Sequence, residues 1–225
     1  MNTPLSPEKS GTAPFENDLD YLMAEIEWIG ARVRRIVAQR QPNEQDDRLV
    51  QRGLRRNIGG GAVRPDLLKC LIVEEKVFRQ AIDSRLNLNR TIGPAIGLDR
   101  ICQQHGLGGF ERTLILLAFI SCLGNRYRED ILWQLDTIFH SCEVTVEAVA
   151  LFLEMGPDET AKGLLHILRD SPLRRQGLVQ LPYDPGYPAD GLSIGISLSG
   201  TCVAEITGIP GFKGFCAPAD EGEVP

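Results

Sequence analysis

The side chains that could do chemistry in this sequence are three histidines and six cysteines, and their spacing does not favour a catalytic or metal site. The histidines are far apart, at His105, His140 and His166. The cysteines form no CxxC pair, whereas a structural zinc site needs two such ligand pairs. They are Cys70, Cys102, Cys122, Cys142, Cys202 and Cys216. Most of them lie in apolar stretches, where a thiol packs as a small hydrophobic group, so we predict reduced cysteines, no metal and a cytoplasmic protein.

Nucleotide-binding loops and nucleophile motifs are also missing from the sequence. The pattern GxxxxGK[ST], whose backbone N–H groups and lysine hold ATP phosphates, does not occur. The nearest segment, GIPGFKG at 208–214, has the wrong spacing and no hydroxyl residue after its lysine. There is no GxSxG elbow, and the carboxylates form no paired motif. We therefore predict that this chain is not an enzyme and has no cofactor of its own.

Arginines are the remaining candidates for binding. The segment Arg32–Arg64 holds nine arginines against three acidic residues, and a second cluster lies next to a strand-like segment. The candidate contacts with a partner or with phosphate are Arg52, Arg55, Arg56, Arg174 and Arg175. The first cluster has no interleaved aromatics for stacking on bases, and the chain's net charge is −6. Nucleic acid is therefore the less favoured partner, and a solvated face or a contact with an acidic surface elsewhere is the alternative.

The composition indicates a globular protein with a substantial core. Hydrophobic residues make up 43% of the 225 residues and charged residues 24%. The N-terminus lacks the basic and apolar regions of a signal peptide. The longest apolar run, Leu114–Ile120, is far shorter than the roughly 20 residues that cross a membrane. We expect no membrane partner.

The N-terminal third is predicted to hold one long helix between two polar segments. Residues 1–14 are rich in Pro, Ser and Thr, which favours a disordered lead. A long amphipathic helix is predicted over 15–41, because five apolar residues recur at 4-3-4-3 spacing. They are Leu22, Ile26, Ile29, Val33 and Ile36. This helix could pack on its own domain or form a coiled-coil stalk, and about two heptads favour the first alternative. Residues 42–64 form a polar linker.

Residues 65–200 are predicted to form a winged-helix-like helical domain. Helices are expected over 66–87, 98–105 and 110–123, and from about 125, 145 and 157 onward, with a loop over 86–97. The segments 178–181 and 193–198 are expected to pair as a β-hairpin. Residues 201–225 are predicted to contain a short helix and an acidic Pro/Gly-rich tail. The fold class is therefore mainly α, a helical bundle with a helix–turn–helix over 98–123 and a small β-hairpin, preceded by a long N-terminal helix.

The helix predicted over 110–123 should lie at the centre of the core. Six Leu, Ile and Phe side chains lie between Leu114 and Ile120. If they are buried, they contribute on the order of 10 kcal/mol before conformational entropy is subtracted. The strongly polar side chains of this helix are Glu111 and Arg112 alone. A helix that reads bases needs several Arg, Lys, Asn or Gln residues on its outer face, so this helix is predicted to pack inside the protein.

Three motifs resemble the N-terminal winged-helix region of bacterial and archaeal AAA-type ATPases, including the ATPase of phage-tail-like contractile injection systems. They are GLGGFERTLILLAFISCLGNRY (106–127), TVEAVALFL (145–153) and SPLRRQGLVQL (171–181). The family's first motif has Ser-Pro where this chain has Gly108-Gly109. It has Ala-Pro-Glu-x-Asp where this chain has SCLGN at 121–125.

The resemblance implies a non-catalytic domain that precedes an ATPase module. ATP and Mg²⁺ would then bind only to that module, and the full-length parent would be a hexamer, whereas this chain could be a monomer. We accordingly expect a docking or regulatory domain that binds a protein partner or substrate of the ATPase. The alternative is a nucleic-acid-binding winged-helix protein that uses the five arginines named above.

Overall fold

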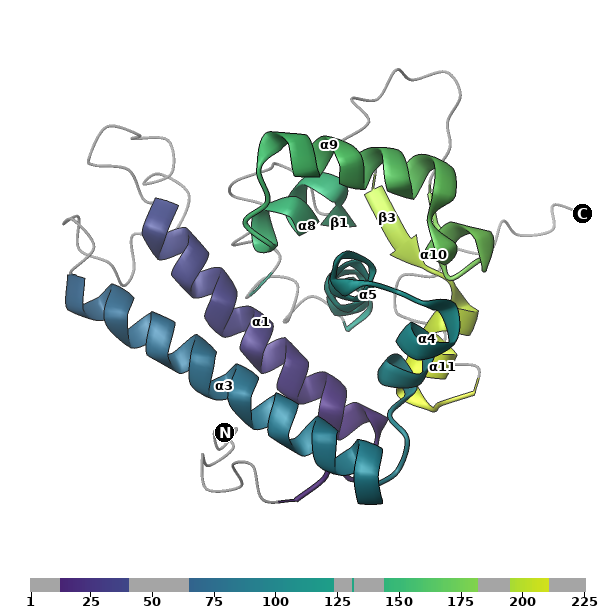
Figure 1. Ribbon diagram of the computed structural model, residues 1–225, viewed down its shortest axis with the longest axis horizontal. Coiled ribbons are helices and arrows are strands. Elements are labelled where there is room, and N and C mark those ends of the chain that lie inside the picture. Colours follow the sequence, from purple (N-terminus) through teal and green to yellow (C-terminus); the bar gives the residue numbers. More distant parts are fainter. Residues whose placement is uncertain (1–12, 41–64, 124–130, 132–143, 182–194, 211–225) are drawn as a thin grey trace, which may run out of the picture.

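A computed structural model describes residues 13–40, 65–123, 131, 144–181 and 195–210 of the chain. The described part is mainly helical and has a small antiparallel sheet (Figure 1), which confirms the predicted fold class. The long helices are α1 (Asp18–Arg40), α3 (Pro65–Ile92) and α5 (Gly109–Cys122). The shorter ones are α4 (Gly97–His105), α8 (Val146–Phe152), α9 (Pro157–Leu165), α10 (Pro172–Arg175) and α11 (Gly200–Thr207), and η4 (His166–Asp170) continues α9 as a π-helix. The strands are β1 (Val144–Thr145), β2 (Val179–Gln180) and β3 (Gly195–Leu198).

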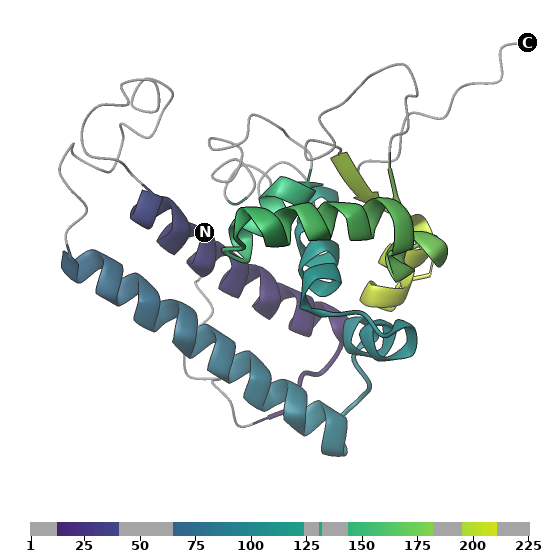
Figure 2. The ribbon, with the colours of Figure 1, turned by 45° about the horizontal axis from the view of Figure 1, so that its top comes forward.

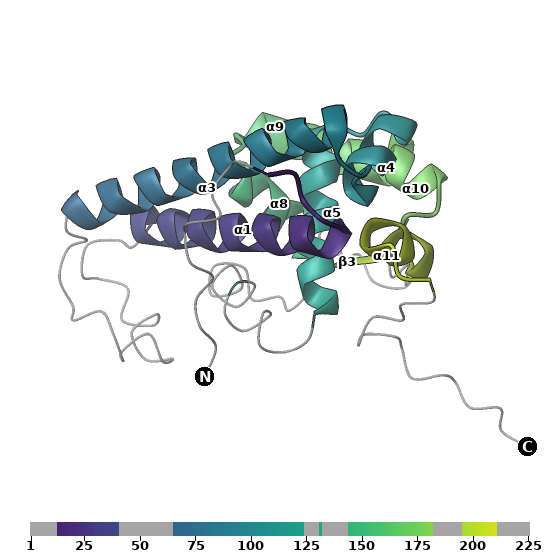
Figure 3. The same ribbon diagram turned by 90° about the horizontal axis from the view of Figure 1, so that it is seen from below.

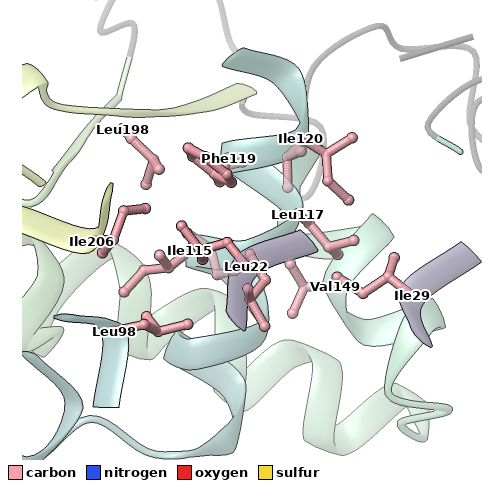
Figure 4. Close-up of a cluster of buried hydrophobic side chains, with 14 of the residues drawn as sticks. Leu22, Ile29, Leu98, Ile115, Leu117, Phe119, Ile120, Val149, Leu198 and Ile206 are labelled. Carbon is pink, nitrogen blue, oxygen red and sulfur yellow. The ribbon is translucent and has the colours of Figure 1, made fainter. Parts of the chain in front are cut away.

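Helix α5 runs through the middle of the core, as its apolar sequence predicts. Every residue from Leu114 to Ile120 is at most 2% exposed. In Figure 1 α5 is viewed almost along its axis, with other elements on all sides of it. Figure 4 shows its side chains between those of α1, α8, α11 and β3. Because this helix is enclosed, it cannot lie in a DNA groove.

Helices α1 and α3 lie side by side and antiparallel (Figures 1 and 3). The five apolar residues of the predicted α1 stripe are all buried, at most 2% exposed. Helix α1 contacts α5, α8 and α11 as well as α3, so it packs on its own domain. Phe15, just before α1, is also buried, and its backbone N–H donates to Asn89 Oδ1 of α3 over 2.7 Å.

Helix α3 is longer than the sequence analysis predicted. It ends at Ile92 instead of Asn87, so the first half of the predicted loop is helical. Residues 86–92 contain no glycine or proline, and the helix continues until Gly93-Pro94. Burial of Leu86 and Asn89 holds this last part of the helix on the domain.

The predicted hairpin is present, and a third strand joins it. Strand β2 pairs with β3 as expected, and β1 pairs with the other edge of β3, which gives the order β1-β3-β2. The helices between β1 and β2 are α8, α9 and α10. A helix, a strand, a helix–turn–helix and then a two-stranded wing is the winged-helix arrangement.

This topology corrects the predicted position of the winged-helix centre. The helix–turn–helix expected over 98–123 does form as α4 and α5, with the turn at Gly106 in the left-handed conformation. However, the pair that follows β1 is α8 and α9, with η4 and the short α10 between α9 and the wing, and α5 is the core helix that precedes β1. The outer helix of the winged-helix unit is therefore α9.

Several predicted segments lie outside the described residues. They are residues 1–12 of the lead, the linker over 42–64, most of the helix expected from Asn125, the segment 182–194 and the tail from 211 onward. The short helix expected after 200 is α11.

Candidate functional site

The outer face of α9 is the winged-helix surface that DNA-binding relatives of this fold insert into the major groove. Helix α9 lies on the outside of the domain (Figure 2), and none of its residues is fully buried. Its first turn exposes Asp158 and Glu159, and its later turns expose Lys162 and Leu165, the latter at 50%. This face is therefore acidic at its start and apolar further along.

The inner face of α9 is fixed to α5 by close packing and by one polar contact. A Cβ at Gly163 would lie 3.1 Å from Cε2 of Phe110, so any larger residue would require the phenyl ring to shift by a few tenths of an ångström. One helical turn further on, His166 Nε2 lies 2.5 Å from Glu111 Oε1. The other carboxylate oxygen of Glu111 accepts a hydrogen bond from the Gly108 N–H over 3.0 Å. These contacts hold the outer face of α9 in one orientation.

The turn between α8 and α9 is tied to the α1–α3 pair by ion pairs. Glu154 in this turn has a φ of 57°, which is unusual for a residue other than glycine. Its carboxylate binds Arg35 of α1 over 2.7 Å, and Arg35 also pairs with Glu75 of α3. The hydrogen bonds that Arg35 donates to Glu154, and after them its hydrogen bond to Glu75, raise the pKa of Arg35 above its ordinary value. One arginine thus links three elements.

A second charged cluster lies at the junction of α1, α3 and α5. The carboxylate of Glu25 is fully buried and accepts hydrogen bonds from Tyr21 Oη (2.7 Å), Arg79 Nη1 (3.0 Å) and Arg112 Nη2 (2.5 Å). Burial, followed by the Glu25 charge, raises the pKa of Tyr21. Burial lowers the pKa of Arg112, but its interactions with Glu25 and Tyr21 raise the pKa by more, so the pKa of Arg112 lies above its ordinary value. Glu25 is therefore the negative charge that two half-buried arginines share.

The arginines predicted as contacts are not brought together by the described structure. Arg174 and Arg175 are exposed on α10, close to β2. Arg52, Arg55 and Arg56 lie outside the described residues. In the N-terminal arginine-rich segment, Arg32, Arg34 and Arg35 pair with Glu74, Glu75 and Glu154. That part of the segment binds acidic side chains within the protein, which is the alternative that the sequence favoured.

The sequence analysis missed the Glu25 cluster, although one signal for it was present. Glu25 lies three residues after Leu22 and four before Ile29, so it falls on the apolar stripe of α1. A carboxylate on a buried stripe needs a cationic partner. Its partners Arg79 and Arg112 come from α3 and α5, and their position depends on how those helices pack.

In the described part of the chain, the potential metal ligands form no cluster and two thiols have raised pKa values. They contain no group of three His, Cys, Asp or Glu side chains that could hold a metal ion. Burial raises the pKa of Cys102 to about 11 and that of Cys202 to about 12, so both thiols are protonated at neutral pH. Among the helices described, none has the length and apolar character needed to cross a membrane.

Comparison with known proteins agrees with the topology of the sheet and helices. A model of the family described as "Winged helix domain, variant" matches residues 3–210, which includes α1 and every described element. No curated protein and no solved structure is similar enough to the chain to count as a match. The match spans nearly the whole chain, and the order β1-β3-β2 with α8 and α9 before the wing is that of the fold. The chain therefore belongs to the family of variant winged helix domains.

Proposed function

We propose that this winged helix domain docks a protein partner and does so as the non-catalytic N-terminal domain of an AAA-type ATPase. The partner is a protein or substrate on which the ATPase module acts. The observation that carries the docking role is the outer face of α9. Asp158 and Glu159 stand in its first turn, and Leu165 is half exposed further along.

This face is unsuited to DNA for an electrostatic reason. The first residues of a recognition helix approach the bases between two phosphate backbones. Carboxylates at those positions are repelled by the phosphates, and α9 exposes only Lys162 as a donor of positive charge. An exposed leucine beside small and charged residues instead suits a protein contact. The burial of α5 removes the other helix that the sequence offered for base contacts.

The link to an AAA-type ATPase is supported by the three motifs between residues 106 and 181. In the structure they form α5, the α8 region and the α10–β2 segment, which are the core helix and the flanks of the winged-helix unit. The resemblance therefore covers part of the core and part of the winged-helix unit. An assembly or remodelling role beside a contractile injection particle is the most specific form of this proposal.

Site-specific photocrosslinking tests the docking role. A benzoylphenylalanine in place of Leu165, in the cells that make this protein, is expected to capture a protein that carries an AAA-type ATPase module or is acted on by one. The same photoreactive residue at Ile92, which is 78% exposed on α3, serves as the control position. Leu165→Asp should reduce co-purification of the captured protein at least tenfold.

The nucleic-acid alternative predicts a different result. Exposed Arg174 and Arg175 on α10 would then contact phosphates next to the wing. A 20-base-pair duplex would bind with steep salt dependence, and R174A/R175A would weaken that binding at least tenfold. This outcome, together with no protein captured at position 165, would overturn the docking role.

A further inference from the structure

A cleft of about 690 Å³ opens between α3 and the turn that joins α4 to α5. This volume is in the range of small-ligand pockets. Leu86 and Asn87 of α3 line one side, and Leu107 of the turn lines the other. Asp83 and Asp99 also line it, and so does Arg112 of α5. The cleft is built from elements other than α9, so it is a second feature of the domain.

Arg112 has hydrogen-bond donors to spare. Its Nη2 donates to both Tyr21 Oη and Glu25 Oε1. Its Nε and Nη1 donate to no side chain or backbone group among the described residues, although the arginine fork carries five N–H donors. The Arg112 side chain is 27% exposed and lines the cleft. An acceptor that enters the cleft can therefore reach a guanidinium that is held in place by Tyr21 and Glu25.

The arginines around the cleft differ in how many of their N–H donors are already used. Arg79 and Arg112 share the fully buried carboxylate of Glu25. Arg79 also pairs with Asp83, whose side chain is 57% exposed. Arg90, the other cation of the cleft, is already held by both oxygens of Asp99. Of the two arginines that line the cleft, Arg112 is therefore the one with N–H donors available for a new partner.

The residues that line the cleft determine which kind of anion can bind there. Asp83 and Asp99 match the two arginines of the lining, so the cleft lacks the excess positive charge that a chain of phosphates needs, and no aromatic side chain lines it to stack on a base. A single carboxylate needs only one arginine fork, which Arg112 provides. Leu86 and Leu107 offer apolar contact beside it. These features match a short protein segment that has one acidic residue next to an apolar one.

We propose that this cleft binds a protein segment through one Asp or Glu side chain, with its carboxylate on Arg112 and a neighbouring apolar side chain against Leu86 and Leu107. The proposal rests on the docking role and names the chemistry of a partner contact. Arg112 acts as the anchor, and the two rim aspartates set the selectivity against nucleic acid.

The test uses two peptides and a pair of charge variants on the full chain. The probes are acetyl-ALELA-amide and acetyl-ALQLA-amide, which differ by one carboxylate. Binding is followed by the ¹H–¹⁵N resonances of Gly106, Gly108 and Gly109, which line the cleft, with Gly177 and Gly200 as remote references. The glutamate peptide is expected to shift the three cleft glycines in a saturable way and to bind at least tenfold more tightly than the glutamine peptide.

Substitution at Asn87 changes the rim charge without touching the Arg112 cluster. Asn87 is exposed on α3 and lines the cleft, so its variants should fold. Asn87→Glu is expected to weaken binding of the acidic peptide at least threefold, and Asn87→Lys to strengthen it by a similar factor. Gln80→Glu and Gln80→Lys, at an exposed α3 position that does not line the cleft, should leave the affinity unchanged.

Equal binding of the two peptides, unshifted cleft glycines, or equal effects of the Asn87 and Gln80 pairs would each overturn the proposal. Tighter binding of a 12-nucleotide DNA strand than of the acidic peptide at the cleft glycines would also overturn it in favour of nucleic acid. The docking role is tested separately, since capture of a protein through position 165 does not depend on the cleft. Capture at 165 without cleft binding would refute the cleft alone.

Discussion

Glu25→Gln is the substitution that most directly tests the buried charge cluster. It keeps the size of the side chain but removes the charge that Arg79 and Arg112 share. Removing one partner of a buried ion pair costs about 3–5 kcal/mol, because the other charge stays buried without compensation. The two arginine side chains keep 23% and 27% exposure, and Arg79 retains Asp83. We therefore expect the lower end, a loss of about 3 kcal/mol in the free energy of unfolding.

Urea unfolding followed by circular dichroism at 222 nm measures this loss. The midpoint should fall while the slope of the free energy against urea stays constant, since the folded surface is little changed. Glu16→Gln, at an exposed position just before α1, is the matched control and should change stability by less than about 0.5 kcal/mol. A loss below about 1 kcal/mol in Glu25→Gln would refute the inference that this carboxylate holds α1, α3 and α5 together.

Three further predictions concern a tight contact, a strained turn and a half-buried thiol. Gly97→Ala should destabilise by about 1–3 kcal/mol in the same urea assay, because its Cβ would lie 2.4 Å from a backbone oxygen of α11. Gly200 is also the first residue of a helix but has open space around it, so Gly200→Ala should be neutral or stabilise the protein by about 0.5 kcal/mol. Equal losses for Gly97→Ala and Gly200→Ala would show that the close contact at Gly97 is not the cause. Glu154→Ala should be less stable than Glu154→Gly by about 1 kcal/mol, because both variants lose the ion pair with Arg35 but only alanine has a Cβ at this positive φ. The reverse order of stability would show that the backbone of this turn is not strained. Burial raises the pKa of the Cys102 thiol to about 11, so little of it is thiolate at pH 8. In variants that keep a single cysteine, Cys102 should therefore react with a disulfide reagent at least about tenfold more slowly than the exposed Cys70. Comparable rates for the two thiols would refute the partial burial of Cys102.

Helices and strands could be predicted where the residue types along one segment are enough to define it. The apolar stripe of α1 and the apolar run of α5 both lie in the core, because a helix with such a surface must remove it from water. The hairpin between β2 and β3 was predicted from two short apolar segments separated by turn residues. Helix α3 ran past its predicted end, because burial of Leu86 and Asn89 stabilises a polar-looking stretch that has no intrinsic helix breaker.

The winged-helix centre could not be placed correctly from the sequence. Strand β1 has only two residues and runs directly into α8, so the sequence shows one helix with Thr145 as its start. Its strand character comes from pairing with Ile196 and Gly195, some fifty residues later. Without β1, the α4–α5 pair was the apparent helix–turn–helix, although α8 and α9 hold that place in the fold.

The sequence by itself determined that the chain is mainly helical, has α5 in its core and lacks the known nucleotide and nucleophile motifs, because these follow from residue types and their spacing along the chain. Only the tertiary structure decided that Glu25 meets Arg79 and Arg112, that Arg35 links α1, α3 and the α8–α9 turn, and that α9 is the exposed winged-helix surface. Each of these depends on contacts between residues about 40 to 120 positions apart, and such contacts form only when the helices pack.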